Sequence, residues 1–159
     1  MCAGFHKSWR FGLLAVVVAW VGFLPPAAAD EANPIRFRNV TDQTGIDFVH
    51  TDGSSGRKYI VEYVCAGMAT FDYNNDGKID IYFLNGRPLA GSDKSVMPKN
   101  RLYRNDGDFH FTDVTDTAGV SGGPGFGLGV CAGDYDNDGF QDLYLSNYGD
   151  NILYHNDGN

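Results

Sequence analysis

The sequence lacks the features that would place it in several large classes of protein. It holds 12 Lys and Arg residues against 20 Asp and Glu residues, so no basic surplus is present to bind nucleic acid. Three Cys residues are too few for a disulfide framework, and no Cys or His pair has a zinc-binding spacing. No long stretch repeats its apolar residues at a helical spacing. We therefore expect neither a helical domain nor a disulfide scaffold nor a nucleic-acid-binding protein.

The longest apolar run is short and lies near the N-terminus. Basic residues Lys7 and Arg10 precede an uncharged run at residues 11–24, and a small-residue A-x-A site precedes Asp30. This order is typical of a secretory signal peptide, which we predict over residues 1–29. A membrane anchor is the alternative, but the run falls short of the about 20 residues needed to span a bilayer. The protein is therefore expected outside the cytoplasm, extracellular or periplasmic, with no membrane span after processing.

Residues 30–159 are expected to form the mature chain, which is strongly acidic. Without Lys7 and Arg10 it retains 10 basic and 20 acidic residues, a formal charge of −10. Two cysteines, Cys65 and Cys131, also remain. Export permits a disulfide between them. Both lie in apolar stretches, so we predict buried free thiols instead.

Two nine-residue segments stand out in this chain, residues 72–80 and residues 134–142. Each has oxygen-bearing side chains at positions 1, 3, 5 and 9 and a glycine at position 6. Carboxylates this close repel one another unless a cation lies between them, and oxygen ligands at alternate positions suit Ca²⁺. The candidate side-chain ligands are Asp72, Asn74, Asp76 and Asp80 in the first segment, and Asp134, Asp136, Asp138 and Asp142 in the second.

Two other interpretations of these segments are open. EF-hand and dockerin loops carry an acid at position 12, where this chain has Phe83 and Leu145, and an EF-hand also needs flanking helices. Asp, Asn and Gly also form turns without any metal. A plain turn, however, does not require acids at fixed alternate positions twice. The pattern therefore favours two calcium-binding loops.

The surrounding sequence repeats together with the two segments. Residues 100–107 recur as residues 151–158, and the pattern Phe-x-x-Val-Thr-Asp at residues 37–42 recurs at residues 111–116. Such internal repetition is the signature of repeat architectures. Alternating apolar and polar residues predict short strands, including one at residues 35–38.

One complete repeat is expected to contain four strands, at residues 68–72, 79–84, 101–105 and 109–114. The Asp-Gly pair at Asp106 and Gly107 predicts a hairpin between the last two. Four-stranded antiparallel units in tandem are propeller blades. The sequence therefore predicts an all-β fold: a partial β-propeller of four-stranded antiparallel blades with calcium-binding loops, truncated at its C-terminus.

These motifs taken together resemble a known family. The acidic loops, the Asn-x-Leu-Tyr-x-Asn-Asp-Gly segments and the Phe-x-x-Val-Thr-Asp segments look like FG-GAP/VCBS repeats, the calcium-binding blades of integrin-α-type propellers. They are most similar to secreted proteins of the cartilage-acidic-protein-like group, which carry an ASPIC/UnbV domain after the propeller. The resemblance covers about residues 35–159, and that further domain would lie beyond Asn159.

The resemblance also implies a ligand set for each site. In the family, positions 1, 3, 5 and 9 bind Ca²⁺ through side chains and position 7 through its backbone carbonyl. Carried over, the carbonyls of Lys78 and Phe140 complete the two sites. Because Asn74 stands where the second site has Asp136, the second site is expected to bind more tightly.

The expected function is non-enzymatic binding or adhesion by a secreted protein with structural Ca²⁺. The partner would be an unidentified protein or carbohydrate, and missing downstream blades of the same chain would complete the propeller. The alternative is the propeller part of a secreted hydrolase or lyase acting on polysaccharide. No residue pair in the sequence is nominated as catalytic.

Overall fold

The computed structural model describes residues 35–64, 67–92, 95 and 97–159. The chain divides into two compact units, Met1–Phe37 and Arg38–Asn159. Of the first unit only residues 35–37 are described, and they have no regular secondary structure. The signal peptide expected over residues 1–29 and the side chain of Cys65 lie outside the described residues. Within the described part, no helix has the length and apolar character to cross a membrane.

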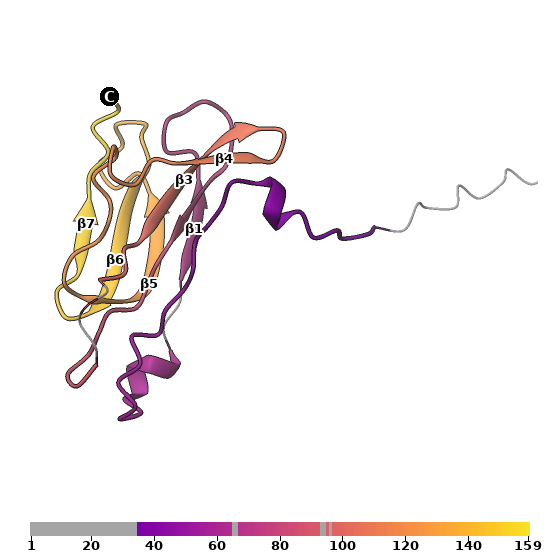
Figure 1. Cartoon of the computed structure of the whole chain (residues 1–159). Coiled ribbons are helices and arrows are strands. Elements are labelled where there is room, and N and C mark those ends of the chain that lie inside the picture. Colours follow the sequence, from indigo (N-terminus) through magenta and orange to yellow (C-terminus); the bar gives the residue numbers. More distant parts are fainter. Residues whose placement is uncertain (1–34, 65–66, 93–94, 96) are drawn as a thin grey trace, which may run out of the picture. The chain divides into compact units, whose positions relative to one another are not determined.

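The described secondary structure is almost entirely strand, as the all-β prediction requires (Figure 1). The helical elements are two short 3-10 turns, η1 (Thr41–Gln43) and η2 (Ile60–Tyr63). The strands are β1 (Met68–Phe71), β2 (Asp80–Phe83), β3 (Arg101–Gly107), β4 (His110–Asp113), β5 (Phe126–Gly133), β6 (Asp142–Tyr148) and β7 (Ile152–Tyr154).

The strands form two antiparallel sheets. The first sheet has the order β1-β2-β3-β4, and the second has the order β5-β6-β7. In the first sheet Ile81 pairs with both Thr70 on β1 and Tyr103 on β3, and Tyr103 pairs in turn with Asp113 on β4. The four antiparallel strands predicted between residues 68 and 114 are confirmed, with boundaries shifted by one or two residues.

The turn between β3 and β4 lies two residues later than predicted. Asp108 and Phe109 have φ of 49° and 63°, so they are the two left-handed central residues of the hairpin turn. The strand β3 continues through Gly107, and the pairing register shifts between Asn105 and Gly107. The Asp-Gly pair therefore forms an irregularity in the strand and not the turn itself.

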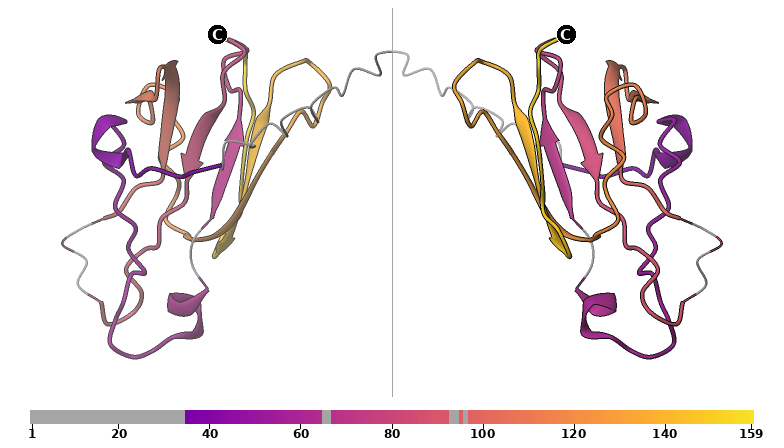
Figure 2. Two further views of the ribbon diagram at one scale, coloured as in Figure 1. Left: turned by 90° about the vertical axis from the view of Figure 1, so that its right-hand side faces the viewer. Right: turned by 90° about the vertical axis from the view of Figure 1, so that its left-hand side faces the viewer.

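The two sheets pack against each other through one hydrophobic core. The first sheet and the residue after β2 contribute Phe71, Tyr82, Leu84 and Leu102, and β6 contributes Leu143 and Leu145. The strands β1 and β5 lie side by side at this junction (Figure 2). The core therefore places the connection that follows β1 beside the connection that follows β5.

The other face of the first sheet is covered by the segment that precedes it. The rings of Phe48 and Phe83 stack with centroids 4.8 Å apart. The hydroxyl of Tyr103 donates a 2.6 Å hydrogen bond to the carboxylate of Asp47. Residues 46–52 thus cover one face of the first sheet while the second sheet covers the other.

Two predictions about single segments were wrong. Residues 35–38 form no strand, although their apolar and polar residues alternate. Cys131 has a free thiol but is exposed, not buried. It pairs with Tyr144 on β6, and Tyr144 is also exposed. Strand alternation therefore places Cys131 on the uncovered face of the second sheet.

That uncovered face repeats a buried face of the first sheet. Tyr82 is fully buried, and its hydroxyl accepts a hydrogen bond from Asn100 (3.0 Å) and donates one to the Val120 carbonyl (2.7 Å). Tyr144 occupies the equivalent repeat position and accepts the same bond from Asn151 (2.9 Å), but it is 41% exposed. The same local structure is therefore covered in one repeat and bare in the next.

Candidate metal centre

The first loop, residues 72–80, folds around the carboxylate of Asp72. One oxygen of Asp72 accepts a hydrogen bond from the backbone N–H of Asp76 (3.0 Å), and the other accepts one from Gly77 (2.8 Å). Asn75 and Gly77 have φ of 57° and 81°, which turns the chain back on itself. Only glycine adopts the left-handed region without strain, and Asn tolerates it better than most residues. The glycine at position 6 is thus required by the backbone.

The second loop, residues 134–142, has the same backbone arrangement. The carboxylate of Asp134 accepts hydrogen bonds from the N–H groups of Asp138 (3.2 Å) and Gly139 (3.0 Å). Asn137 and Gly139 have φ of 62° and 93°. The two loops are therefore structural copies, as their sequences predict.

The carboxylates at position 9 are held in the same way in both loops. Asp80 is 0% and Asp142 is 2% exposed. One oxygen of each accepts a hydrogen bond from the N–H of the residue at position 2, Tyr73 (3.0 Å) or Tyr135 (3.1 Å). The other accepts one from the next strand or the residues after it: Asn105 N–H (2.7 Å) for Asp80 and Asn156 N–H (2.8 Å) for Asp142.

Burial affects these two carboxylates differently. Burial raises the pKa of Asp80, against the opposing effect of the N–H groups of Asn105 and Tyr73. Burial also acts to raise the pKa of Asp142, but hydrogen bonds from Asn156, Tyr135 and His155 outweigh it and lower the pKa. The negative charge of an ionised Asp80 is thus less well compensated by the chain than that of Asp142. A bound cation would compensate it.

Two asparagines support the loops from outside the predicted ligand set. The side-chain amide of Asn105 donates to the carbonyl of Ile79 (3.0 Å), and that of Asn156 donates to the carbonyl of Gln141 (3.1 Å). Neither Asn105 nor Asn156 was among the residues predicted to contribute to the two sites. Their recurrence at the same place in both repeats was the signal that would have identified them.

The second loop has one more acid than the first, because Asp136 stands where the first loop has Asn74. Asp134, Asp136 and Asp142 each offer an oxygen within 4.8 Å of the others, and Asp136 and Asp138 form a similar group with His155. Both groups of this kind found among the described residues contain two or three acids of the second loop. A site whose donor atoms are mostly carboxylate and carbonyl oxygens suits a hard cation such as Ca²⁺. The donor set of the second loop therefore fits the predicted ion.

The first loop differs from the second in charge, because a lysine of the first loop forms an ion pair with one of its acids. The ammonium group of Lys78 lies 2.8 Å from the Asp76 carboxylate. The second loop has Phe140 at this position, which supplies no charge. The carbonyls of Lys78 and Phe140, and the Asn74 side chain, remain predicted ligands.

His155 contacts the second loop, which the sequence did not predict. Its Nδ1 atom lies 3.2 Å from Asp142 and 3.7 Å from Asp136. Burial acts to lower its pKa, but the hydrogen bond to Asp142 and the neighbouring carboxylates raise it. The equivalent residue of the first repeat, Arg104, instead pairs with Asp106 at 2.7 Å. The two loops therefore have differently charged neighbours.

Two side-chain amides connect the loops to each other. The amide of Asn75 in the first loop donates to the Gly139 carbonyl in the second loop (3.0 Å). The amide of Asn156, which also supports the second loop, donates to the Tyr73 carbonyl in the first loop (2.8 Å). The two candidate sites are therefore neighbours joined by hydrogen bonds in both directions.

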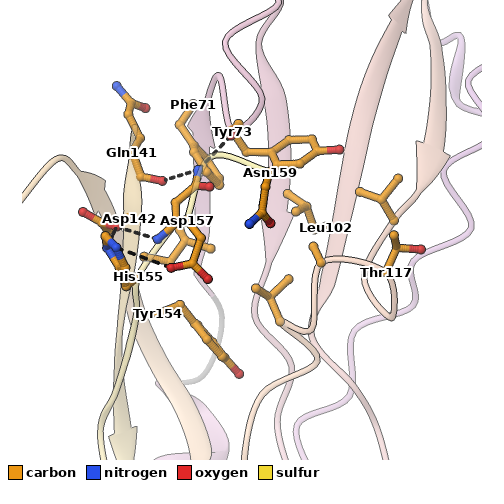
Figure 3. A pocket seen from close by; sticks show the side chains of 15 residues that line it. Phe71, Tyr73, Leu102, Thr117, Gln141, Asp142, Tyr154, His155, Asp157 and Asn159 are labelled. Carbon is orange, nitrogen blue, oxygen red and sulfur yellow. Dashed lines mark hydrogen bonds and ion pairs between the residues drawn. The ribbon is translucent and has the colours of Figure 1, made fainter. Parts of the chain in front are cut away.

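A pocket of about 250 Å³ opens beside this junction (Figure 3). Its apolar lining includes Phe71, Leu102 and Tyr154, and its polar lining includes Asp142 and His155. Both oxygens of Asp142 accept backbone hydrogen bonds, and one also contacts His155. Asp142 is therefore committed to the loop.

Comparison with known proteins finds one family model that matches part of this region. Residues 72–145 match the model of a family described as FG-GAP-like repeat. The match starts at the first residue of the first loop and ends in β6, so it includes both loops and the strands β2 to β5. No curated protein and no solved structure matches the chain. The match supports the FG-GAP repeat family, and the all-β fold with two antiparallel sheets agrees with it.

Proposed function

We propose that this protein is a secreted, non-enzymatic binding or adhesion module of the propeller type whose two acidic loops each bind a structural Ca²⁺ ion. The FG-GAP-like match supports the binding-module part of this proposal. The ASPIC/UnbV-associated group is the subfamily that its motifs resemble. The acids of the two loops are predicted calcium ligands, so we propose no catalytic role for them.

The observation that carries the calcium proposal is the pair of buried position-9 carboxylates. Asp80 and Asp142 are each fixed by two backbone N–H donors beside further acids of their loops. Buried carboxylates are costly unless they are paired or bind a metal. A bound Ca²⁺ would neutralise each cluster and hold its strand pair, β1 with β2 or β5 with β6, together.

Repeat stacking supports the propeller part of the proposal. The face of the first sheet that carries Tyr82 and Leu102 packs on the second sheet. The equivalent residues of the second sheet, Tyr144 and Leu153, are 41% and 53% exposed. A further repeat of the same kind is the partner that fits this face, because the first sheet already shows how such a face is covered. The ligand surface of the module would then lie elsewhere.

Export makes weak calcium sites sufficient. Extracellular calcium modules have dissociation constants of about 10⁻⁴–10⁻³ M. An ion that binds only the folded chain, present at 100 times its dissociation constant, stabilises that chain by about 2.7 kcal/mol. For a unit of this size, such a gain raises the melting temperature by roughly 5 °C or more.

Thermal unfolding with calcium and with a chelator tests this proposal. Calcium should raise the melting temperature of the parent chain, and Asp138→Ala should reduce that rise. Asp150→Ala is the matched control, because it removes a carboxylate that is also exposed but lies outside the loops. Equal melting temperatures with calcium and with chelator would contradict structural calcium binding.

A further inference from the structure

Two side-chain hydrogen bonds connect the two repeats at the acidic loops. The Asn75 amide reaches the Gly139 carbonyl at 3.0 Å, and the Asn156 amide reaches the Tyr73 carbonyl at 2.8 Å. Each bond starts in one repeat and ends on the backbone of the other. The contact is therefore between the sites themselves and not only between the sheets that carry them.

Each accepting carbonyl lies next to predicted ligands. Tyr73 stands between Asp72 and Asn74 in the first loop, and Gly139 stands between Asp138 and Phe140 in the second. Because the peptide unit is planar, fixing such a carbonyl also orients the N–H of the next residue, Asn74 or Phe140, which is itself a predicted ligand. The two amides thus act on the backbone that must be ordered for a cation to bind.

The donating side chains are equally close to the sites. Asn75 occupies the left-handed position of the first loop, with φ of 57°. Asn156 donates its backbone N–H to Asp142 while its amide holds Tyr73. Ordering either loop therefore positions the donor that orders the other.

We propose that the two cation sites bind cooperatively, and that the amides of Asn75 and Asn156 carry the coupling between them. This inference rests on the proposed calcium sites. A cation in one loop fixes the donor and acceptor groups that the second loop uses, so less conformational entropy is lost when the second cation binds. Coupling of this kind is reciprocal, so each site changes the affinity of the other by the same factor.

The sequence offers a matched pair of variants for Asn75. Asn137 is its equivalent in the second loop and has nearly the same backbone conformation, with φ of 62°. No interloop hydrogen bond from Asn137 is found within the described residues. Glycine adopts this conformation without strain. Asn75→Gly and Asn137→Gly therefore make the same backbone change, and only Asn75→Gly removes an interloop bond.

A mutant cycle in calorimetric Ca²⁺ titrations of the full chain tests the coupling. Asp76→Ala disables the first site, and we expect it to weaken calcium binding at the second site by about threefold to tenfold. The same substitution should have a smaller effect at the second site in the Asn75→Gly background and the full effect in the Asn137→Gly background. Circular dichroism confirms that each variant is folded.

The outcomes separate this inference from the function on which it rests. A chain that binds no calcium overturns the proposed function and the coupling together. If the parent chain binds two ions but Asp76→Ala leaves the affinity of the second site unchanged, the proposed function stands and the coupling is overturned. An undiminished effect in the Asn75→Gly background overturns the role of Asn75.

Discussion

Lys78 and Asp76 form an ion pair inside the first loop, with the ammonium nitrogen 2.8 Å from a carboxylate oxygen. The side-chain hydrogen bond from Lys78 lowers the pKa of Asp76, which keeps this carboxylate ionised. The same ammonium group would compete with the proposed cation for one of the predicted ligands. The first loop therefore carries an internal competitor that the second loop lacks.

Removal of this competitor should improve calcium binding at the first loop. We expect Lys78→Ala to raise the affinity of the first site by severalfold, because a fixed positive charge beside Asp76 is lost. Lys99→Ala is the matched control, since Lys99 pairs with Asp116 at the same 2.8 Å distance outside the loops. Calcium titration of both variants measures the difference. Equal affinities in the two variants would refute competition by Lys78.

The equivalent tyrosines of the two repeats should differ in their effect on stability. Tyr82 is fully buried and makes two hydrogen bonds, so Tyr82→Ala should lower the free energy of unfolding by about 3–5 kcal/mol. Tyr144→Ala should cost less than about 1 kcal/mol, because the 41% exposed side chain leaves little cavity. Urea unfolding measures both variants. Equal losses would mean that the face of Tyr144 is covered in solution.

Acid should weaken the first sheet through Asp113. Burial acts to raise the pKa of Asp113, but hydrogen bonds from Thr115 and the charge of Arg101 lower it overall. A carboxylate whose pKa is lower in the folded state stabilises the protein above its unfolded pKa, near 3.8, and loses this effect as the pH falls through its folded pKa. Asp113→Asn should therefore be less stable than the parent at pH 6, by about 1 kcal/mol.

The difference between parent and Asp113→Asn should shrink as the pH falls below 3.8. Urea unfolding in the presence of chelator measures it without a contribution from bound metal. Asp116→Asn is the control, because the Asp116 side chain is 73% exposed and should contribute little. A difference that stays constant between pH 6 and pH 3 would rule out the Asp113 carboxylate as its source.

Local patterns in the sequence predicted the loops and the strands well. The positions of Asp and Gly in the two loops are required by the hydrogen bonds around Asp72 and Asp134, so their spacing carried the information. The four strands of the first sheet followed from alternation and repetition. The strand predicted at residues 35–38 was wrong, because a local pattern of alternation does not reveal whether a segment has a neighbouring strand to pair with.

The contacts between the repeats could not be predicted from the sequence. The bonds from Asn75 to Gly139 and from Asn156 to Tyr73 join residues 64 and 83 positions apart. The contact of His155 with Asp142 depends on how the residues after β7 lie beside the second loop. The exposure of Cys131 depends on which face of the second sheet meets the first. Each of these follows from packing and not from spacing.

The central claim is that each chain binds two calcium ions through its acidic loops, the second loop more tightly. Calorimetric titration of chelator-treated protein with Ca²⁺ tests it most directly, with Asp76→Ala and Asp138→Ala measured beside the parent. The account predicts two ions per chain, with a larger loss of affinity from Asp138→Ala, because three carboxylates of the second loop lie within 4.8 Å of one another. A parent chain that binds no calcium would contradict the claim, and a larger loss from Asp76→Ala would contradict the ranking of the two sites.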